Sequence, residues 1–472
     1  MAEHHSVIIV GAGITGLATA WWLHKSGADV VVLERDSAVG GTMKTVHTGG
    51  WLIETGPNSA LETTPLLKKL SAEVGIEDEL IYANEAADNR YILRDGALHP
   101  LPMKPALFLK SKLWSLYGKL RLLKEPFIGR SLKEETIAEF VARRLGKEFL
   151  DYAINPFVAG VYAGNPEQLS VQAAFPKLYA LEKNYGGLIK GQILGARERK
   201  KRAEKAKDRS RLFSYKRGMQ TLPDAIGKAL GSRVHVNAAI ERIFSVSRNG
   251  TGSKKIIHVT GTENGTNFTV TGDAVILAVP SHTAAAMVEP LDVPLATSLK
   301  NIYYPPVAEV YLGFSNGDIR RPLDGFGFLI PEMEHRNILG TIWSSVLFPG
   351  RAPEGRSALT SFVGGSRQPD LAGRNDAELI EIVVHELQSI MNVAGTPVFS
   401  HVTRWEKAIP QYRIGHLAVI EQAEQFEKNN GGFFLSGNYR GGIAVGDCVI
   451  NSERTAERVK SFLASARETI SV

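Results

Sequence analysis

The stretch Ser6-Val7-Ile8-Ile9-Val10-Gly11-Ala12-Gly13-Ile14-Thr15-Gly16 decides the fold. An apolar run with helical character follows it, and then Ala28-Asp29-Val30-Val31-Val32-Leu33-Glu34. Short β-branched apolar runs predict buried strands, and the glycines between the first strand and the helix predict a tight turn. The chain therefore opens with a predicted βαβ unit.

The glycines of this turn each have a physical task, and together they predict a dinucleotide site. Gly11 permits the sharp turn out of the strand, Gly13 keeps a side chain away from an approaching pyrophosphate, and Gly16 lets helix and strand pack closely. The helix N-terminus offers free N–H groups and a positive dipole end to a phosphate. Glu34 ends the second strand, where its carboxylate can accept hydrogen bonds from ribose hydroxyls.

A second glycine pair lies in Asp36-Ser37-Ala38-Val39-Gly40-Gly41-Thr42-Met43-Lys44. NAD and FAD domains share the βαβ unit, so that unit alone does not distinguish them. A backbone that approaches the ribityl and pyrophosphate groups of a flavin, with Lys44 nearby as a cation, needs such a loop. The pair favours FAD, and an ordinary Gly-Gly turn is the alternative. The stretch from Gly49 to Ser59 predicts a strand that ends in a Gly-Pro turn, and this turn would place residues 56–59 at the isoalloxazine end.

The composition is that of a globular chain of 472 residues, 44% of them apolar, enough for two to three domains. The single cysteine, Cys448, excludes an intramolecular disulfide and any zinc or iron–sulfur site built from cysteines, which fits a reducing compartment. We predict no metal site, and no nucleic-acid binding because no recognised motif is present. Since no secretory signal and no run of ~20 apolar residues occur, we expect a protein that is soluble or lies on a membrane surface.

From Lys104 to about Lys190 the sequence is apolar and aromatic at helical spacing, with lysines spaced through it. It predicts a helical insertion, whose amphipathic part can lie in a membrane interface or pack in a core. The net charge of +6 is concentrated in residues 195–211, GARERKKRAEKAKDRSR. This segment is either a solvated loop or a basic patch for anionic lipid or an acidic partner.

The predicted fold class is mixed α/β (α+β): a Rossmann-like nucleotide domain, an antiparallel-sheet substrate domain and a helical insertion. Alternating patterns over residues 307–314, 325–330, 338–346 and 357–363 predict that sheet, and a helix over 376–391 crosses it. The predicted parts, in chain order, are nucleotide domain 1–88, substrate-domain hairpin 89–103, helical insertion 104–214, nucleotide domain 215–295, substrate domain 296–400 and nucleotide domain 401–472.

Several motifs together extend over almost the whole chain. Besides the opening unit they are Val39-Gly40-Gly41, Glu54-Thr55-Gly56-Pro57-Asn58, Asn89-Arg90-Tyr91, Gly160-Val161-Tyr162-Ala163-Gly164, Thr403-Arg404-Trp405, Pro410-Gln411-Tyr412, Gly437-Asn438-Tyr439 and Gly441-Gly442-Ile443-Ala444. In these motifs the chain resembles the oxygen-dependent protoporphyrinogen oxidase family, a branch of the amine-oxidase-like flavoproteins. The first motifs are general to that superfamily, and the later ones indicate the branch.

The resemblance implies FAD bound without a covalent link. The residues it assigns to FAD are Gly11, Ala12, Gly13, Gly16, Glu34, Arg35, Gly41, Gly56, Pro57, Asn58, Ser59, Ile240, Trp405, Gly442, Ile443 and Ala444. Ile240 matches the position whose backbone meets the adenine, and Trp405 is alternatively a core residue. Arg90 matches an arginine that pairs with a substrate propionate, and Gly160 matches a glycine that lets the macrocycle approach. The alternatives are an exposed hairpin arginine and a helix-breaking glycine.

The implied reaction is oxidation of protoporphyrinogen IX to protoporphyrin IX by six electrons, in three rounds, with O2 reduced to hydrogen peroxide. An aromatising substrate supplies the driving force, so the protein supplies position and excludes competing reactions, and no side-chain base is assigned. The alternatives are a coproporphyrinogen III oxidase and another amine-oxidase-like flavoenzyme. The resemblance also implies a cytoplasmic location, with peripheral contact to the inner face of the cell membrane and hand-off to a ferrochelatase as open possibilities. The oligomeric state is not predicted.

Overall fold

The computed structural model describes residues 3–102, 104–201, 211–247 and 255–468. Its first sheet has the strand order β10-β2-β1-β13-β12-β11, with β19 beside β13. The strands are β1 (Glu3–Val10), β2 (Val30–Leu33), β10 (Val234–His235), β11 (Ala238–Ser247), β12 (Lys255–Glu263), β13 (Thr266–Leu277) and β19 (Phe433–Leu435). β1 runs parallel to β2 and β13, as the opening motif predicts, and β11 to β13 form an antiparallel meander.

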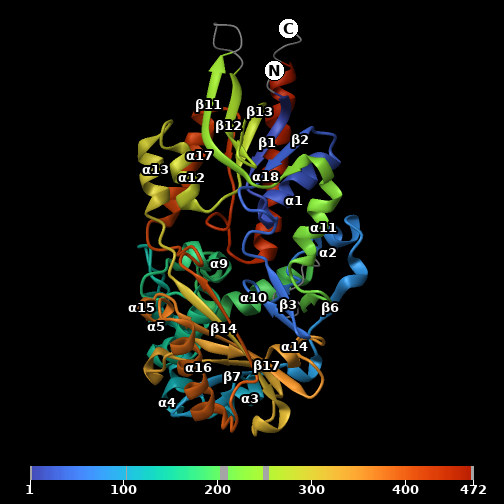
Figure 1. The fold of residues 1–472 in the computed structure, drawn as a ribbon. Coiled ribbons are helices and arrows are strands. Elements are labelled where there is room, and N and C mark those ends of the chain that lie inside the picture. The colour runs from blue at the N-terminus through green and yellow to red at the C-terminus, as the bar shows by residue number, and fades with distance from the viewer. Residues whose placement is uncertain (1–2, 103, 202–210, 248–254, 469–472) are drawn as a thin grey trace.

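Helices cover both faces of this sheet in the upper part of the molecule (Figure 1). The helices on one face are α1 (Ile14–Lys25), α2 (Pro65–Glu73), α11 (Thr221–Leu230) and α18 (Val445–Glu468), and those on the other are α12 (Ser281–Val288), α13 (Val293–Lys300) and α17 (His416–Asn429). In β1, Val7 and Ile9 join the first cluster, whereas Ile8 and Val10 join the second. Residues 7–10 of this strand are buried on both faces, and they form a continuous apolar run.

The second sheet, in the lower part of Figure 1, has the order β18-β14-β17-β16-β15-β7-β8. Its strands are β7 (Asn89–Arg94), β8 (Ala97–Pro100), β14 (Val307–Ser315), β15 (Gly325–Leu329), β16 (Gly340–Ile342), β17 (Arg356–Gly364) and β18 (Phe399–Trp405). Neighbours are antiparallel except β15 and β7, which are parallel. The predicted helix over 376–391 is α16 (Asp376–Met391), which packs Leu379, Val383 and Leu387 against this sheet.

The predicted strand over 338–346 is only partly correct. Residues Gly340–Ile342 form β16, but Ser344–Leu347 form the short helix α14. Side-chain hydrogen bonds replace the strand ladder here, because the Ser344 hydroxyl pairs with Thr360 at 2.7 Å and Ser345 accepts from the Ala358 N–H.

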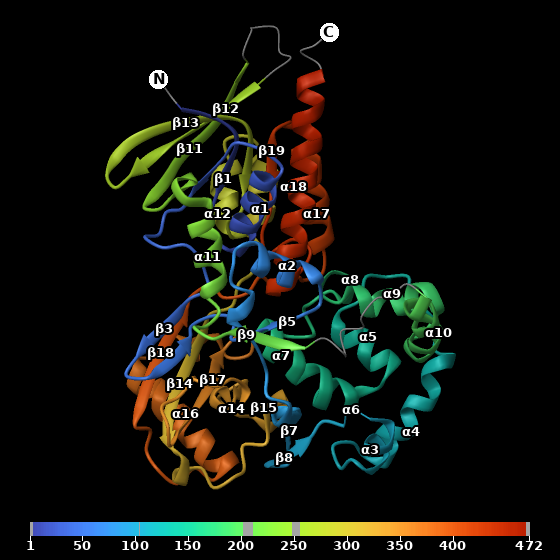
Figure 2. The same ribbon diagram turned by 90° about the vertical axis from the view of Figure 1, so that its right-hand side faces the viewer.

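A helical lobe lies beside the second sheet (Figure 2). Its helices are α3 (Pro105–Lys110), α4 (Leu116–Arg121), α5 (Ile137–Arg144), α6 (Lys147–Phe149), α7 (Asn155–Tyr162), α8 (Val171–Ala174), α9 (Pro176–Tyr185) and α10 (Leu188–Lys201). The fully buried Arg144 guanidinium joins them through Glu125 at 3.2 Å and Glu182 at 2.7 Å. Residues 202–210 of the predicted basic segment lie outside the described residues.

Two small elements join the parts. The hairpin of β3 (Thr45–Thr48) and β4 (Trp51–Glu54) packs Trp51 and Ile53 on Tyr311 of the second sheet. β5 (Ala60–Leu61), β9 (Leu212–Tyr215) and β6 (Leu80–Tyr82) form a three-stranded sheet. The domain boundaries proposed at 214/215 and 400/401 fall inside β9 and β18, respectively. All of β18, including residues 401–405, belongs to the second sheet. None of the described helices is long and apolar enough to cross a membrane.

Candidate active site

The glycine turn between β1 and α1 divides into packed positions and one open position. A Cβ on Gly11 would lie 2.6 Å from the Ala278 oxygen, and one on Gly16 would lie 1.9 Å from the Gly11 oxygen. A Cβ on Gly13 would meet no atom within 4 Å. Gly13 is also the N-cap of α1, where no side chain caps the free N–H groups and no acidic residue occupies the first turn. The helix end is therefore open to an anion.

The Glu34 carboxylate lies directly beside this turn. It is buried and accepts the Ala12 N–H at 2.7 Å and the Asp36 N–H at 2.9 Å, one through each oxygen. Each oxygen keeps a further lone pair for a ribose hydroxyl. The Glu34 carbonyl accepts the Ala238 N–H at 2.7 Å, which brings β11 and its half-buried Ile240 to the same edge.

The second glycine pair packs on the first. The Gly40 N–H donates to the Ala12 carbonyl at 2.8 Å, and a Cβ on Gly41 would lie 3.3 Å from the Gly13 Cα atom. Gly41 has a φ of +58°, a conformation that favours glycine. Two cationic side chains lie beside the Asp36 carboxylate. The Arg35 Nε is 3.6 Å from its Oδ1, and the Lys44 Nζ is 3.6 Å from its Oδ2.

The loop over residues 56–59 is held by two distant parts of the chain. The Trp405 indole N–H donates to the Thr55 carbonyl at 2.6 Å. The Asn58 amide donates to the Glu309 carboxyl at 2.9 Å and to the Gly56 carbonyl at 3.1 Å. Gly56, Pro57, Asn58 and Ser59 are half-buried. Trp405 therefore has a specific contact to the predicted cofactor loop, beyond packing.

The loop before α18 is fixed by a buried aromatic pair that we did not predict. The Tyr412 hydroxyl accepts the Gly442 N–H at 3.0 Å and donates to the Asn438 carbonyl at 2.5 Å. His416 stacks on Tyr412 with ring centroids 4.2 Å apart, and its Nε2 hydrogen-bonds the Tyr439 carbonyl at 2.8 Å. Burial lowers the pKa of His416 to about 4, so the ring is neutral and donates this hydrogen bond. Both residues come from the segment that follows the Thr403-Arg404-Trp405 motif.

The two predicted substrate residues lie on one face of the second sheet. Arg90 pairs with Gly327 of β15, and its side chain shares a face with Ile92, which packs in one cluster with Leu329. A Cβ on Gly160 of α7 would lie 2.5 Å from the Leu329 Cδ2. Arg90 is exposed, with its guanidinium 5.8 Å from the Phe326 ring centroid. The missing side chain of Gly160 thus has a packing role against Leu329.

A buried charge cluster lies where the β3–β4 hairpin meets the second sheet. Arg351 is 2% exposed and lies 3.5 Å from Glu54, whose carboxyl also accepts from Thr45 and the Met219 N–H. Burial raises the pKa of Glu54 to about 7, opposed by Arg351, and raises the pKa of Glu309 to about 8. No sequence motif marks Glu309 or Arg351 as members of this cluster, because their partners are far away along the chain.

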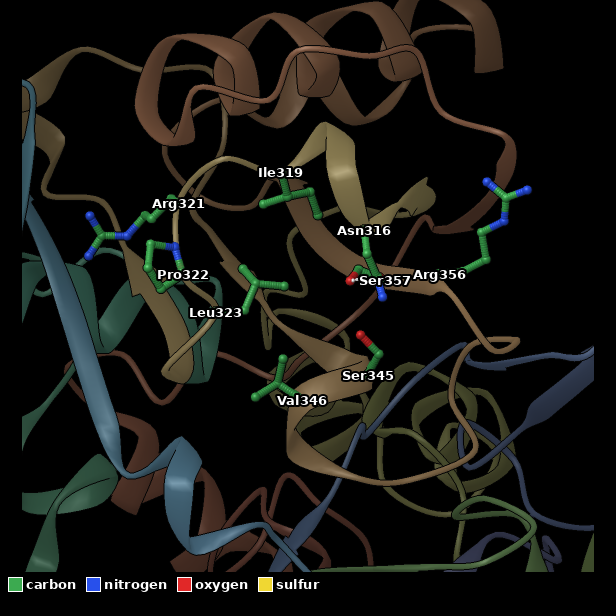
Figure 3. A pocket seen from close by; sticks show the side chains of 9 residues that line it. All are labelled: Asn316, Ile319, Arg321, Pro322, Leu323, Ser345, Val346, Arg356 and Ser357. Atoms are coloured by element: carbon green, nitrogen blue, oxygen red, sulfur yellow. Dashed lines mark hydrogen bonds between the residues drawn. The ribbon is translucent and has the colours of Figure 1, made fainter.

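A cavity of about 390 Å³ lies elsewhere on the second sheet, between the end of β14, α14 and the start of β17 (Figure 3). Arg321 and Arg356 lie on opposite sides of it. None of the predicted cofactor or substrate residues lines it. Volume alone therefore does not locate the active site.

Comparison with known proteins shows the family. The family of flavin-containing amine oxidoreductases matches residues 14–460. The chain belongs to this family. It is 34% identical to the chloroplastic protoporphyrinogen oxidase of Nicotiana tabacum, over 97% of the chain and 85% of that protein. It is 30% identical to the coproporphyrinogen III oxidase of Bacillus subtilis, over 97% of the chain and 98% of that protein. A structure from Exiguobacterium sp. 255-15 shares the fold, with a TM-score of 0.78, 23% identity and coverage of 98% and 99%.

This flavin-containing amine oxidoreductase is an FAD-dependent enzyme, as the motifs predicted. The residues present fit FAD on structural grounds. The open position at Gly13 and the uncapped end of α1 suit the pyrophosphate, and the Glu34 carboxylate beside them suits a ribose. When bound, FAD supplies the electron acceptor of the reaction. The chain itself supplies the binding loops and their fixed spacing.

Proposed function

We propose that this flavoprotein is an oxygen-dependent protoporphyrinogen IX oxidase of heme biosynthesis. The observation that supports this most strongly is its 34% identity to the tobacco protoporphyrinogen oxidase over 97% of the chain. The substrate loses six electrons and six hydrogen atoms to give protoporphyrin IX. Three molecules of O2 accept them and become three molecules of hydrogen peroxide, so the overall reaction balances.

The chain's own contribution is recognition and placement. We assign Arg90 to a propionate, because a planar guanidinium binds a carboxylate with two parallel hydrogen bonds. Its exposed side chain, with no ion pair among the described residues, is free for this task. Gly160 lies on the same face of the second sheet, where we propose that the macrocycle passes close to α7. No side-chain base is proposed, since aromatisation drives the reaction and the protein provides orientation.

Coproporphyrinogen III is the second candidate substrate. The Bacillus subtilis relative that bears this name is matched over 98% of its own length, against 85% for the tobacco protein. The two substrates differ in propionate number, four against two, and so in the number of basic contacts they require. Steady-state rates of porphyrin formation with each porphyrinogen decide between them. A kcat/KM at least tenfold higher for coproporphyrinogen would overturn our first assignment, and peroxide formation only with amines would overturn both.

We propose that the FAD is held without a covalent bond. The only thiol, Cys448, is buried at 5% exposure within the first core, and burial raises the pKa of this thiol to about 11. A buried thiol of this kind is inert toward bond formation. Denaturation in acid should release all yellow colour into the supernatant. Flavin that stays with the precipitated protein would contradict this assignment.

We also propose a cytoplasmic enzyme that rests on the inner face of the cell membrane through its helical lobe. Large apolar side chains of α3, α4 and the following turn are exposed, and they are Leu109 (71%), Leu116 (73%), Tyr117 (79%), Leu123 (68%) and Phe127 (89%). Exposed lysines lie among them at 110, 112 and 124. Apolar residues flanked by cations fit an anionic bilayer surface. Trp114, by contrast, stacks on Phe149 and belongs to the core.

The proposed recipient of the product is a ferrochelatase. This proposal rests on the resemblance to porphyrinogen oxidases, since porphyrin is the substrate into which such an enzyme inserts iron. Co-purification of the two proteins on anionic vesicles, compared with vesicles of neutral lipid, tests it. Equal recovery of the ferrochelatase with and without this protein would contradict a direct transfer.

A further inference from the structure

Glu309 is a buried carboxyl at the centre of the face that β14 turns toward the nucleotide domain. Residues 307, 309 and 311 share this face, because side chains alternate along a strand. Val307 packs in one cluster with Ala159 of α7, which is next to Gly160, and with Ala163, which follows that helix. Tyr311 packs on Trp51 and Ile53 of the β3–β4 hairpin. Glu309, which is 4% exposed, therefore lies between the proposed substrate helix and the cofactor side.

The contact of Glu309 is to the cofactor loop. Its Oε1 accepts the Asn58 amide at 2.9 Å, and the same amide group donates to the Gly56 carbonyl. Asn58 is thereby held between its own loop and the second sheet. Among the described residues, no second side-chain hydrogen bond joins residues 56–59 to the second sheet. Together with the Trp405 contact to the Thr55 carbonyl, the buried Glu309 side chain holds this loop against the second sheet.

We propose that Glu309 is a positioning residue of the oxidation, which holds Asn58, and with it the loop over residues 56–59, in the arrangement that the reaction requires. The proposal rests on the proposed function, because it assumes that this loop meets the reactive end of FAD. In this proposal Glu309 acts through its hydrogen bond to Asn58 and not by direct contact with the reacting atoms.

Charge in this cluster supports a protonated Glu309. The neighbouring carboxyl, Glu54, forms an ion pair with the buried Arg351, whereas Glu309 has no ion pair among the described residues and hydrogen-bonds to Asn58. The other groups that face the cluster, Asn58 and Tyr311, are uncharged at neutral pH. Burial raises the pKa of Glu309, the Asn58 hydrogen bond opposes this and the Glu54 charge adds to it, with a net pKa of about 8. The neutral acid accepts the Asn58 amide without placing an uncompensated charge beneath the loop.

The matched variants are Glu309→Gln, Glu309→Leu and, as a control, Glu381→Gln on the exposed face of α16. Gln is close in shape to the neutral acid, and its carbonyl can accept the Asn58 amide. We expect Glu309→Gln to keep kcat at pH 7 within about threefold of wild type. Glu309→Leu should lose about tenfold or more in kcat, because Asn58 loses its acceptor. Glu381→Gln should match wild type throughout.

The pH profile distinguishes positioning from packing. Above pH 8 ionised Glu309 should lower kcat and change the visible absorption of bound FAD, and Glu309→Gln should abolish both effects. In the folded state the raised pKa favours the protonated acid, so wild-type stability falls as pH rises from about 4.5 toward 8. The melting temperature of Glu309→Gln should therefore exceed that of wild type by roughly 2 °C or more at pH 8, and match it near pH 5.

Two results would overturn the proposal: a Glu309→Gln pH profile identical to wild type, or loss of FAD and of cooperative unfolding in both variants. Failure of the substrate assignment is separable from these, because the absorption titration and the melting curves need no substrate. If no porphyrinogen is oxidised but the absorption change near pH 8 disappears in Glu309→Gln, Glu309 keeps its positioning role and only the proposed substrate is wrong.

Discussion

Replacement of Gly13 by alanine separates cofactor binding from folding. The Gly13 backbone has φ −67° and ψ 171°, which alanine adopts without strain. An added Cβ meets no protein atom within 4 Å. Alanine gains about 0.4–1 kcal/mol by restricting the unfolded chain and loses about as much as a poorer N-cap. We therefore expect the unfolding free energy of the apoprotein to change by less than about 1 kcal/mol.

FAD binding should respond quite differently. If the pyrophosphate lies against the open end of α1, the new methyl group occupies its place and breaks at least one charge-assisted hydrogen bond. Such a bond is worth roughly 1.5–3 kcal/mol, which is roughly a 10- to 150-fold rise in the Kd for FAD. The measurements are quenching of flavin fluorescence on titration of the apoprotein, and thermal unfolding of the same sample.

Two further glycines complete this experiment. Gly317→Ala is the matched control, since a Cβ there also meets nothing within 4 Å, and it should leave both measurements unchanged. Gly16→Ala should destabilise the apoprotein itself, because its Cβ would lie 1.9 Å from the Gly11 oxygen. An unchanged FAD Kd in Gly13→Ala would refute the assignment of the pyrophosphate to this turn. A large loss of apoprotein stability in Gly13→Ala would refute the expectation that the space around Gly13 accommodates a methyl group.

Three other predictions address the substrate, the pH dependence and the membrane surface. Arg90→Ala should lower kcat/KM by about one to two factors of ten without loss of FAD, and wild-type kcat/KM in this variant would contradict the assigned role. Arg90→Lys should recover only part of the lost kcat/KM, because a point charge cannot replace a bidentate guanidinium. His416 has a folded-state pKa of about 4, below its ordinary 6.5, so the stability of the protein should fall as pH drops from about 6.5 to 4. His416→Phe should be less stable at pH 7 and show a flatter pH dependence in thermal unfolding, and an equally steep dependence would contradict this prediction. The double variant Leu116→Ser, Phe127→Ser should bind anionic vesicles about tenfold or more weakly at an unchanged melting temperature. The control Val293→Ser, at a residue of α13 that is 61% exposed, should keep wild-type vesicle binding, and equal binding by all three proteins would contradict the proposed surface.

The sequence by itself determined the nucleotide fold and the two glycine turns that we assign to the cofactor. The turn at residues 11–16 and the glycine pair at 40–41 are local, because backbone conformation and close approach depend on which residue lacks a side chain. The helix over 376–391 was equally readable, since its capping box and apolar spacing lie within one segment. The turn of the hairpin formed by β7 and β8 is equally local, because Asp95 and Gly96 both have positive φ.

Only the tertiary structure decided how distant segments complete the site. Trp405 reaches Thr55, Tyr412 holds Gly442, and Glu309 holds Asn58, although hundreds of positions separate two of these pairs in the chain. Strand 338–346 was mispredicted in part, because Ser344 bonds to Thr360 on a neighbouring strand. The protonation of Glu309 likewise depends on burial, on its hydrogen bond to Asn58 and on the nearby Glu54 charge. Long-range contacts and desolvation have no periodicity in the sequence, so the folded chain alone reveals them.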